Sequence, residues 1–283
     1  MNYTQHARQV LSSLRTHPRK QLGQNFMIDE TSLDYIRDRI SESRSEKLLE
    51  IGPGLGFLTD KLLECHRSLV AIDVDKRFCE YLSQKYAENS AIRIRCEDAI
   101  RSDWNTFLDH HSYACVGNIP YQISSPLIEK LIQHRDRIKE AYFTFQKDFA
   151  DRLLAPVGSR ECGALTVWAK FFLDGEVLRV FKPHVFYPQP KIDSCLVRIR
   201  VRNVEVLGSL RHLIQACFQQ RRKMMVVSLN HAYPQLGKLT IQHLLSDVGI
   251  SPQARPEALA LEQWAALGKS FYERHPERSE GSG

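Results

Sequence analysis

The 283-residue sequence predicts an α/β protein with a doubly wound, mostly parallel sheet of seven strands and a small, all-helical C-terminal domain. Three observations support this prediction. From residue 47 to about residue 200, short apolar runs alternate with segments of helical periodicity, the pattern of a parallel sheet covered by helices on both faces. The first run ends in a glycine-rich turn that opens a helix. After about residue 203 only helical periodicity continues.

The predicted elements follow one another in alternation. Strands are expected at residues 47–51, 68–73, 92–95, 113–118, 141–145, 176–180 and 195–201. Helices are expected at residues 56–65, 76–86 and 124–133. A proline-rich link, Pro183 to Pro190, separates the last two strands and is too short for a crossover helix. We therefore expect the last strand to pair antiparallel.

The helical domain is expected after a boundary near residue 203. Helical periodicity returns in residues 207–220, 239–246 and 257–271, with breaks at Pro234, Gly249, Pro252 and Pro256. We predict a first domain over residues 1–203, a helical domain over residues 204–273 and a disordered polar tail over residues 274–283.

Composition excludes several classes of protein. A hydrophobic content of 43% is enough for a sizeable core, and no apolar run approaches the roughly 18 to 20 residues of a membrane helix. Residues 1–20 are polar and basic, unlike a secretory signal, so we expect a cytoplasmic protein. The seven cysteines are scattered without a C-x-x-C pair, which favours small core residues over disulfides or a metal site. The net charge of +6 is compatible with nucleic-acid binding.

A glycine-rich loop over residues 52–56 follows the first predicted strand. Its glycines allow a tight turn and let a ligand approach the backbone, so we predict that Glu50, Gly52 and Gly54 line a nucleotide-type cofactor. The loop is not a phosphate-binding P-loop, because no Gly-Lys-Ser/Thr follows. By itself it would also fit an ordinary tight turn.

Acidic residues follow the next two strands. Asp73 ends an apolar run at the sheet edge where doubly wound folds bind ligands, and its carboxylate can accept hydrogen bonds from both ribose hydroxyls. A solvated strand-end acid is the alternative, for which Asp75 is an equally placed neighbour. After the third strand, Asp98 and Ala99 lie where the cofactor's adenine amine would be held. The loop and Asp73 fit an NAD-dependent dehydrogenase nearly as well as a methyltransferase, and the third acid helps to separate the two.

The motif over residues 118–121 (Asn-Ile-Pro-Tyr) follows the fourth strand and favours a methyltransferase. An adenine N6 amine is a poor nucleophile, because its lone pair is delocalised into the ring. Two acceptors aimed at its hydrogens, the Asn118 side-chain carbonyl and the Ile119 backbone carbonyl, would localise that pair. Pro120 restrains the loop, and Tyr121 can stack on a base turned out of its stack. An ordinary Asn-X-Pro turn is the alternative.

With these motifs the sequence resembles the ribosomal RNA adenine N6,N6-dimethyltransferase family, from about residue 20 to the start of the tail. The resemblance lies in residues 21–26 (QLGQNF), 118–121 (NIPY), 143–147 (FTFQK), 186–194 (FYPQPKIDS) and 218–223 (FQQRRK). It implies a Rossmann-like methyltransferase domain, S-adenosylmethionine as cofactor and adenine N6 as the methylated group.

The resemblance also implies roles for single residues. Gln24, Asn25 and the backbone of Met27 would lie at the cofactor, the last two at its methionine end. Phe186 would form the second wall of the base pocket, opposite Tyr121. Asn118 would border both the cofactor and the base.

Two positions depart from the family pattern. Met27 stands where the family usually has Leu, a change that conserves volume and polarity. Asp73 stands where the family usually has Glu, which shortens the reach to the ribose by one methylene. The departure alters the fine geometry of the ribose contact and leaves its role intact.

A dense basic element, Arg221-Arg222-Lys223, lies in the predicted helical domain. Phosphate binding is the functional interpretation, and a solvated helix face is the alternative. Lys147 and Lys191 are weaker candidates for RNA contact.

The resemblance implies dimethylation of two adjacent adenines near the 3′ end of small-subunit (16S) ribosomal RNA, with a role in small-subunit biogenesis. The expected partners are ribosomal RNA and the immature small subunit, and the expected state is a monomer without membrane association. One alternative is a large-subunit adenine N6-methyltransferase that confers antibiotic resistance. Another is a largely non-catalytic assembly or transcription factor on the same fold, against which the intact motifs argue.

Overall fold

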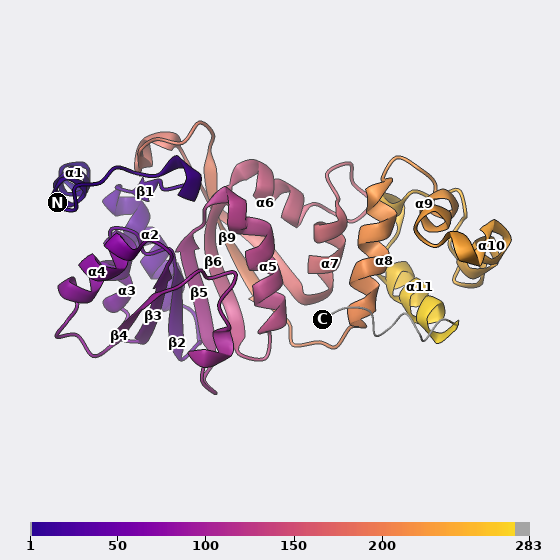
Figure 1. Ribbon diagram of the computed structural model, residues 1–283, viewed down its shortest axis with the longest axis horizontal. Helices are drawn as coiled ribbons and strands as arrows, with labels where there is room; N and C mark the ends of the chain where they lie inside the picture. The colour runs from indigo at the N-terminus through magenta and orange to yellow at the C-terminus, as the bar shows by residue number, and fades with distance from the viewer. Residues whose placement is uncertain (1, 275–283) are drawn as a thin grey trace. The chain divides into compact units, whose positions relative to one another are not determined.

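A computed structural model describes residues 2–274, and its contacts divide the chain into two compact units (Figure 1). The first unit contains residues up to 150 and residues 173–202. The second contains residues 151–172 and the chain from residue 203 onward. The chain crosses between the units three times, and the third crossing, between residues 202 and 203, lies one residue before the expected boundary. Residues 151–172 are expected in the first domain, but they group with the helical unit.

The first unit is built on a seven-stranded sheet in the order β4-β3-β2-β5-β6-β9-β7. Its strands are β2 (Lys47–Ile51), β3 (Ser68–Asp73), β4 (Ile92–Cys96), β5 (Tyr113–Asn118), β6 (Ile138–Gln146), β7 (Leu173–Phe181) and β9 (Ser194–Val201). Strands β2 to β6 pair in parallel, and β9 pairs antiparallel with both β6 and β7. The mostly parallel sheet and its antiparallel last strand are confirmed.

Helices flank this sheet in the first unit (Figure 1). They are α1 (Tyr3–Ser13), α2 (Glu30–Ser41), α3 (Phe57–Leu63), α4 (Lys76–Lys85), α5 (Ser124–Gln133) and the start of α6 (Lys147–Leu154), with 3₁₀ turns η1 (Lys20–Leu22), η2 (Trp104–Thr106), η3 (Tyr121–Ile123) and η4 (Pro183–Val185). The sequence pattern does not predict α1, α2 or α6. Helix α2 starts where the Asp29 side chain accepts the backbone N–H of Ser32 at 2.8 Å, a side-chain cap that a search for apolar periodicity overlooks.

A two-stranded sheet that the sequence pattern does not predict joins distant parts of the first unit. Strand β1 (Phe26–Met27) pairs antiparallel with β8 (Phe186–Tyr187), with Phe26 opposite Tyr187 and Met27 opposite Phe186. These strands have two residues each, too few to show periodicity. The pairing places the N-terminal motif beside the proline-rich loop.

The hydrophobic core of the first unit includes aromatic side chains from both ends of its chain. Tyr3, Phe57, Phe78 and Phe186 all belong to one buried cluster. Burial of a side chain of this size contributes roughly 1.5 to 3 kcal/mol each. The cluster explains why α1 is held against the sheet domain, although its sequence is polar overall.

The second unit is helical. It contains α7 (Ala164–Phe172), α8 (Gly208–Gln219), α9 (Met225–Ala232), α10 (Lys238–Asp247) and α11 (Leu261–Arg274), with 3₁₀ turns η5 (Pro234–Leu236) and η6 (Pro256–Ala258). Trp264 is fully buried and stacks on Phe218, with ring centroids 6.2 Å apart. Among the described residues, no helix is both long enough and apolar enough to cross a bilayer. The predicted tail lies outside the described residues, except for Arg274, which ends α11.

Candidate active site

The glycine-rich loop leaves β2 at the carboxyl edge of the sheet, where β3 and β5 also end. Gly52 has φ +71°, and a Cβ added there would meet nothing within 4 Å. Gly54 has φ +55°, and a Cβ there would lie 2.9 Å from the Phe26 ring. The backbone at Gly52 is therefore open to a ligand, while Gly54 is required for close packing against β1.

Two buried carboxyl groups lie beside this loop. Thr59 donates its hydroxyl hydrogen to Glu50 at 2.7 Å, and the Gly54 backbone N–H donates to Asp73 at 3.1 Å. Burial raises the pKa of Glu50 to about 8 and the pKa of Asp73 to about 6. Both groups are buried without a cation bonded to them among the described contacts, so a ligand that brings positive charge or hydroxyl donors fits this cavity.

The third strand-end acid is more exposed. Asp98 accepts the Ile100 backbone N–H at 2.8 Å, and Arg101 lies 3.6 Å from its second oxygen. The neighbouring Ala99 is buried, and its carbonyl accepts the Trp104 indole N–H at 2.8 Å. These contacts fix the turn after β4 and leave a carboxylate at the rim of the cavity.

All of the residues predicted to hold the cofactor line one cavity. They are Gln24, Asn25, Met27, Glu50, Gly52, Gly54, Asp73, Asp98, Ala99 and Asn118. The lining residues run along the sheet edge from the turn after β4, past the end of β3 and the glycine loop, to the end of β5. An extended ligand with a nucleoside at one end and an amino acid at the other would fit along this line. The individual cofactor contacts remain predictions.

A second, smaller pocket adjoins the first. Of the residues predicted for chemistry, Asn118, Ile119, Tyr121 and Phe186 line it, whereas Pro120 lines the larger cavity. Phe186 is 2% exposed and Tyr121 is 37% exposed. The pocket therefore has one aromatic wall that is packed into the core, Phe186, and one that an incoming base can reach, Tyr121.

The Asn118 side chain is held in one orientation. Its amide nitrogen donates to the backbone carbonyl of Asn25, so the oxygen end of the amide is the acceptor that it offers to a substrate. The next residue is anchored as well, because the Ile119 N–H donates to the Thr144 carbonyl at 3.0 Å. The two predicted amine acceptors are thus anchored to Asn25, directly before β1, and to Thr144 of β6.

The structure adds residues that the pattern analysis does not single out. Thr144 lines both cavities, and Ser194 and Phe145 line the smaller one. Thr144 and Ser194 are buried polar residues at the ends of strands that meet at this sheet edge. A threonine inside the otherwise largely apolar segment 141–145 of β6 is the signal that points to Thr144.

Some of the predicted RNA-contacting residues belong to the first unit and the others to the second. Lys147 and Lys191 are exposed in the first unit. In the second unit Arg222 and Lys223 are exposed, whereas Arg221 is half-buried and donates to the Arg160 carbonyl. Arg221 therefore has a structural bond that its two neighbours are not shown to share.

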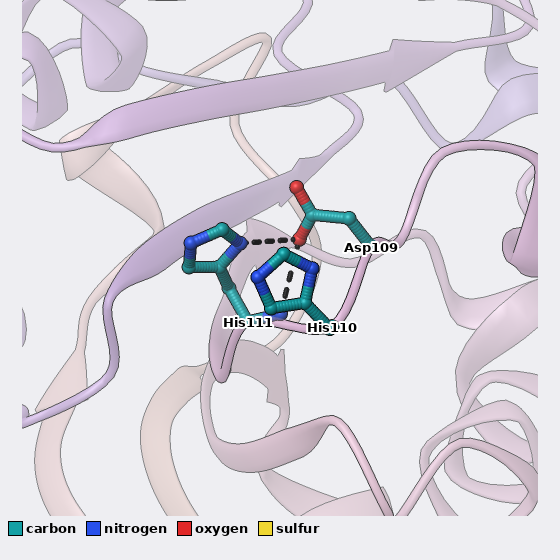
Figure 2. Close-up of side chains that lie close together, drawn as sticks. All are labelled: Asp109, His110 and His111. Carbon is teal, nitrogen blue, oxygen red and sulfur yellow. Dashed lines mark hydrogen bonds and ion pairs between the residues drawn. The ribbon is translucent and has the colours of Figure 1, made fainter.

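Figure 2 shows a cluster of Asp109, His110 and His111 whose potential ligand atoms lie within 4.8 Å of one another. Asp109 accepts hydrogen bonds from the His111 ring at 2.9 Å and from the Tyr113 hydroxyl at 3.1 Å, and its other oxygen pairs with Lys47. Because Lys47 and Tyr113 begin β2 and β5, the cluster lies at the sheet edge opposite Asn118. The Asp109 carboxylate is thus already engaged by three protein side chains, so we assign the cluster a structural role.

Comparison with known proteins identifies the family. The family model described as ribosomal RNA adenine dimethylase matches residues 15–272. The chain belongs to this family. It is therefore an S-adenosylmethionine-dependent methyltransferase of ribosomal RNA adenine, and the dehydrogenase alternative has no support.

Individual relatives agree with this assignment. A protein of Picosynechococcus named ribosomal RNA small subunit methyltransferase A is 34% identical over 268 residues, which cover 88% of this chain and 96% of the relative. The solved structure of a dimethyladenosine transferase from Plasmodium falciparum has a TM-score of 0.74 and 27% identity, covering 88% and 98% of the two chains. That of the 23S rRNA methyltransferase ErmE has a TM-score of 0.63 and 25% identity, covering 87% and 99%.

Proposed function

We propose that this enzyme transfers methyl groups to the N6 amines of two adjacent adenines near the 3′ end of small-subunit ribosomal RNA. The observation that carries the proposal is the position of Asn118, which lines both the cofactor cavity and the aromatic pocket. Asn118 would then hold the target N6 amine where the cofactor cavity meets the base pocket. The similarity to proteins named small subunit methyltransferase A over most of their length supports the choice of subunit.

The residues of the larger cavity fit the cofactor. Asp73 would accept the ribose hydroxyls and Asp98 the adenine amine, while the open backbone face at Gly52 admits the ligand. Burial raises the pKa of Glu50, and the ammonium group at the amino-acid end of a bound cofactor would favour the ionised form of this carboxyl. When bound, S-adenosylmethionine supplies an activated methyl group on a sulfonium.

The chain's own contribution to transfer is alignment and electrostatics. In the first transfer the Asn118 side-chain oxygen and the Ile119 carbonyl would accept the two N6 hydrogens, and in the second the monomethylated amine keeps one hydrogen for one of these acceptors. Either contact favours a tetrahedral nitrogen whose lone pair points at the methyl group. Tyr121 and Phe186 hold the base between them. The ammonium product is acidic enough to lose its proton to solvent, so no strong general base is required.

We propose a cytoplasmic monomer that acts on the immature small subunit. The second unit would supply phosphate contacts through Arg222 and Lys223, which are exposed cations. Arg221, Lys147 and Lys191 are weaker candidates for the same contacts. A methylated loop alone offers little surface for a second unit, which is the reason to expect a larger assembly as substrate.

The experiment that tests this function supplies purified ribosomal subunits with labelled S-adenosylmethionine. We expect label in small subunits that lack the modification, at two adjacent adenines, with two methyl groups on each. Label in the large subunit only would overturn the proposal. It would favour methylation of large-subunit ribosomal RNA, the activity for which the structural relative ErmE is named. Tight binding to the small subunit without transfer would instead support a non-catalytic assembly factor.

We predict that cofactor affinity falls below pH 6 because of Asp73. Its carboxyl has a pKa raised to about 6 by burial, so it takes up a proton as the pH falls through that value and can no longer accept both ribose hydroxyls. The dissociation constant of S-adenosylhomocysteine should rise about fivefold from pH 6 to pH 5, because a carboxyl with a pKa of about 6 is already half protonated at pH 6. Calorimetry at several pH values measures this. Asp73→Asn should bind weakly with little pH dependence, and a wild-type affinity that is flat from pH 7 to pH 5 would contradict the prediction.

The same shift has a consequence for stability. Because the folded-state pKa lies above the unfolded value of 3.8, the folded state binds the extra proton, and Asp73 lowers the free energy of unfolding as the pH rises through the window from about 4 to about 6. This is opposite to the usual contribution of an ion-paired aspartate. Comparing wild type with Asp73→Asn across that window isolates the effect.

We predict that the double variant Arg222→Ala/Lys223→Ala binds RNA more weakly and that its RNA affinity depends less on salt concentration. Each lost phosphate contact should reduce the slope of log K against log salt by about 0.7 on single-stranded RNA. Filter binding at several salt concentrations measures the slope. Lys269→Ala is the matched control, because Lys269 is an exposed cation of the same unit that lies near Glu273. An unchanged slope would mean that these cations do not contact phosphate.

A further inference from the structure

Asp75, beside the ribose-binding candidate Asp73, is buried rather than solvated. It is 4% exposed, and its backbone N–H donates to Asp73 at 2.9 Å. Its side chain caps α4 through the Arg77 backbone N–H at 3.2 Å and forms an ion pair with the Arg77 guanidinium, with an Nε–Oδ1 distance of 2.8 Å. The sequence-based alternative of a solvated strand-end acid is therefore wrong for this residue.

Gln24 connects Asp75 to the N-terminal segment, residues 16–27. Its amide nitrogen donates to Asp75 at 3.1 Å, and its amide oxygen accepts the Arg19 backbone N–H at 2.8 Å. Both polar ends of this half-buried side chain are thus engaged within the protein. This occupation argues against the predicted role of Gln24 as a direct cofactor contact.

A further bond ties the same segment to the same pair. The Arg77 guanidinium donates to the hydroxyl of Thr16, which is 6% exposed. The segment is therefore attached at Thr16 and at Gln24 to one buried ion pair. At its far end the Asn25 carbonyl accepts from Asn118, and Phe26 pairs with Tyr187.

We infer that Thr16, Gln24, Asp75 and Arg77 form a latch that holds the N-terminal segment closed over the cofactor cavity, with Gln24 as a positioning residue. Residues 21–27 of this segment line the cavity and contribute no described bond to Asp73. The latch acts on the cofactor through Asn25 and Met27. The inference rests on the proposed placement of the cofactor in this cavity.

The physical basis is preorganisation. A segment already held in its bound position loses less conformational freedom on binding, so the latch raises the affinity for any ligand that the segment covers. It makes no contact with the donated methyl group or with the target amine. Loss of the latch should therefore raise KM for the cofactor far more than it lowers kcat.

The test is Gln24→Leu, which keeps the size of the side chain and removes both hydrogen bonds. We expect the dissociation constant of S-adenosylhomocysteine and KM for S-adenosylmethionine to rise about tenfold, the effect of losing one hydrogen bond to a charged group. We expect kcat at saturating cofactor to change by less than about twofold. The matched control is Gln263→Leu, because Gln263 also uses both ends of its amide, on Gly249 and Ala260, within the second unit. Wild-type affinity in Gln24→Leu would overturn the inference.

A reversed pair tests the contact itself. Gln24→Glu places a carboxylate against Asp75 and should weaken binding, whereas adding Asp75→Asn provides an amide N–H for the new glutamate. The double variant should bind S-adenosylhomocysteine more tightly than Gln24→Glu alone. Additive losses would show that the two residues do not act through their shared bond.

Hydrogen exchange in the ligand-free protein separates the latch from the proposed function. Gln24→Leu should speed exchange of the amides in residues 16–24, including that of Arg19, without ligand present. Unchanged exchange there would overturn the latch. If wild type failed to bind S-adenosylhomocysteine, the cofactor placement would fail instead, and the exchange result would still decide whether the segment is latched.

Discussion

Asn118→Ala is expected to reduce methyl transfer by about 100- to 1000-fold, the range seen when one preorganised polar group is removed from a transition-state site. The substitution removes the side-chain acceptor for the target amine and the bond to the Asn25 carbonyl. The base would still stack between Tyr121 and Phe186, so binding to the ribosomal subunit should be nearly unchanged. Single-turnover transfer of labelled methyl groups measures the chemical step.

The control for this substitution is Asn105→Ala. Asn105 is exposed and bonds only to Asp103 among the described contacts, on the turn η2 after β4. It should transfer methyl groups at the wild-type rate. If Asn118→Ala kept more than a tenth of that rate, Asn118 would not be the amine acceptor, and the Ile119 carbonyl alone would have to orient the base.

Much of this architecture is predictable from sequence because its signals are local. Each strand of the parallel sheet is an apolar run, and the carboxyl ends of parallel strands meet at one edge. Glu50, Asp73, Asp98 and Asn118 each lie at or near the carboxyl end of such a run, so their convergence on one cavity follows from topology. The aromatic wall at Phe186 required the family resemblance, because no local pattern links it to β5.

The parts that sequence does not predict depend on tertiary contacts. Strands β1 and β8 are too short to show alternation, and they exist because two loops meet. Asp73 ends β3 and lines the cofactor cavity, whereas Asp75, two residues later, caps α4 and pairs with Arg77. The hydrogen bond that Gln24 donates to Asp75 from 51 residues away depends on the fold and has no local signal. Likewise, residues 151–172 group with the helical unit through packing of α7 against α8 and α11.

Gly117→Ala is expected to damage both stability and activity. Gly117 is in β5, directly before Asn118, and a Cβ there would lie 2.4 Å from the backbone oxygen of Ile51 and 2.9 Å from the Ile119 side chain. The clash is with the backbone of neighbouring strand β2, which cannot rotate away as a side chain can. Overpacking of this kind costs about 1 to 3 kcal/mol. The melting temperature should therefore fall by about 3 to 10 °C for a domain of this size.

The activity loss follows from displacement of the reaction loop. Moving β5 away from β2 shifts Asn118 relative to the glycine loop, and a displacement of about 1 Å at such a site costs about 100-fold in rate. Thermal unfolding and single-turnover transfer at a temperature where the variant is folded measure the two effects separately. Gly208→Ala is the matched control: a Cβ at Gly208, the first residue of α8, meets nothing within 4 Å, so this variant should melt at or slightly above the wild-type temperature and stay fully active. A Gly117→Ala enzyme with wild-type melting and rate would show that β2 and β5 can separate without moving Asn118, and the close strand contact would then have no part in positioning the amine acceptor.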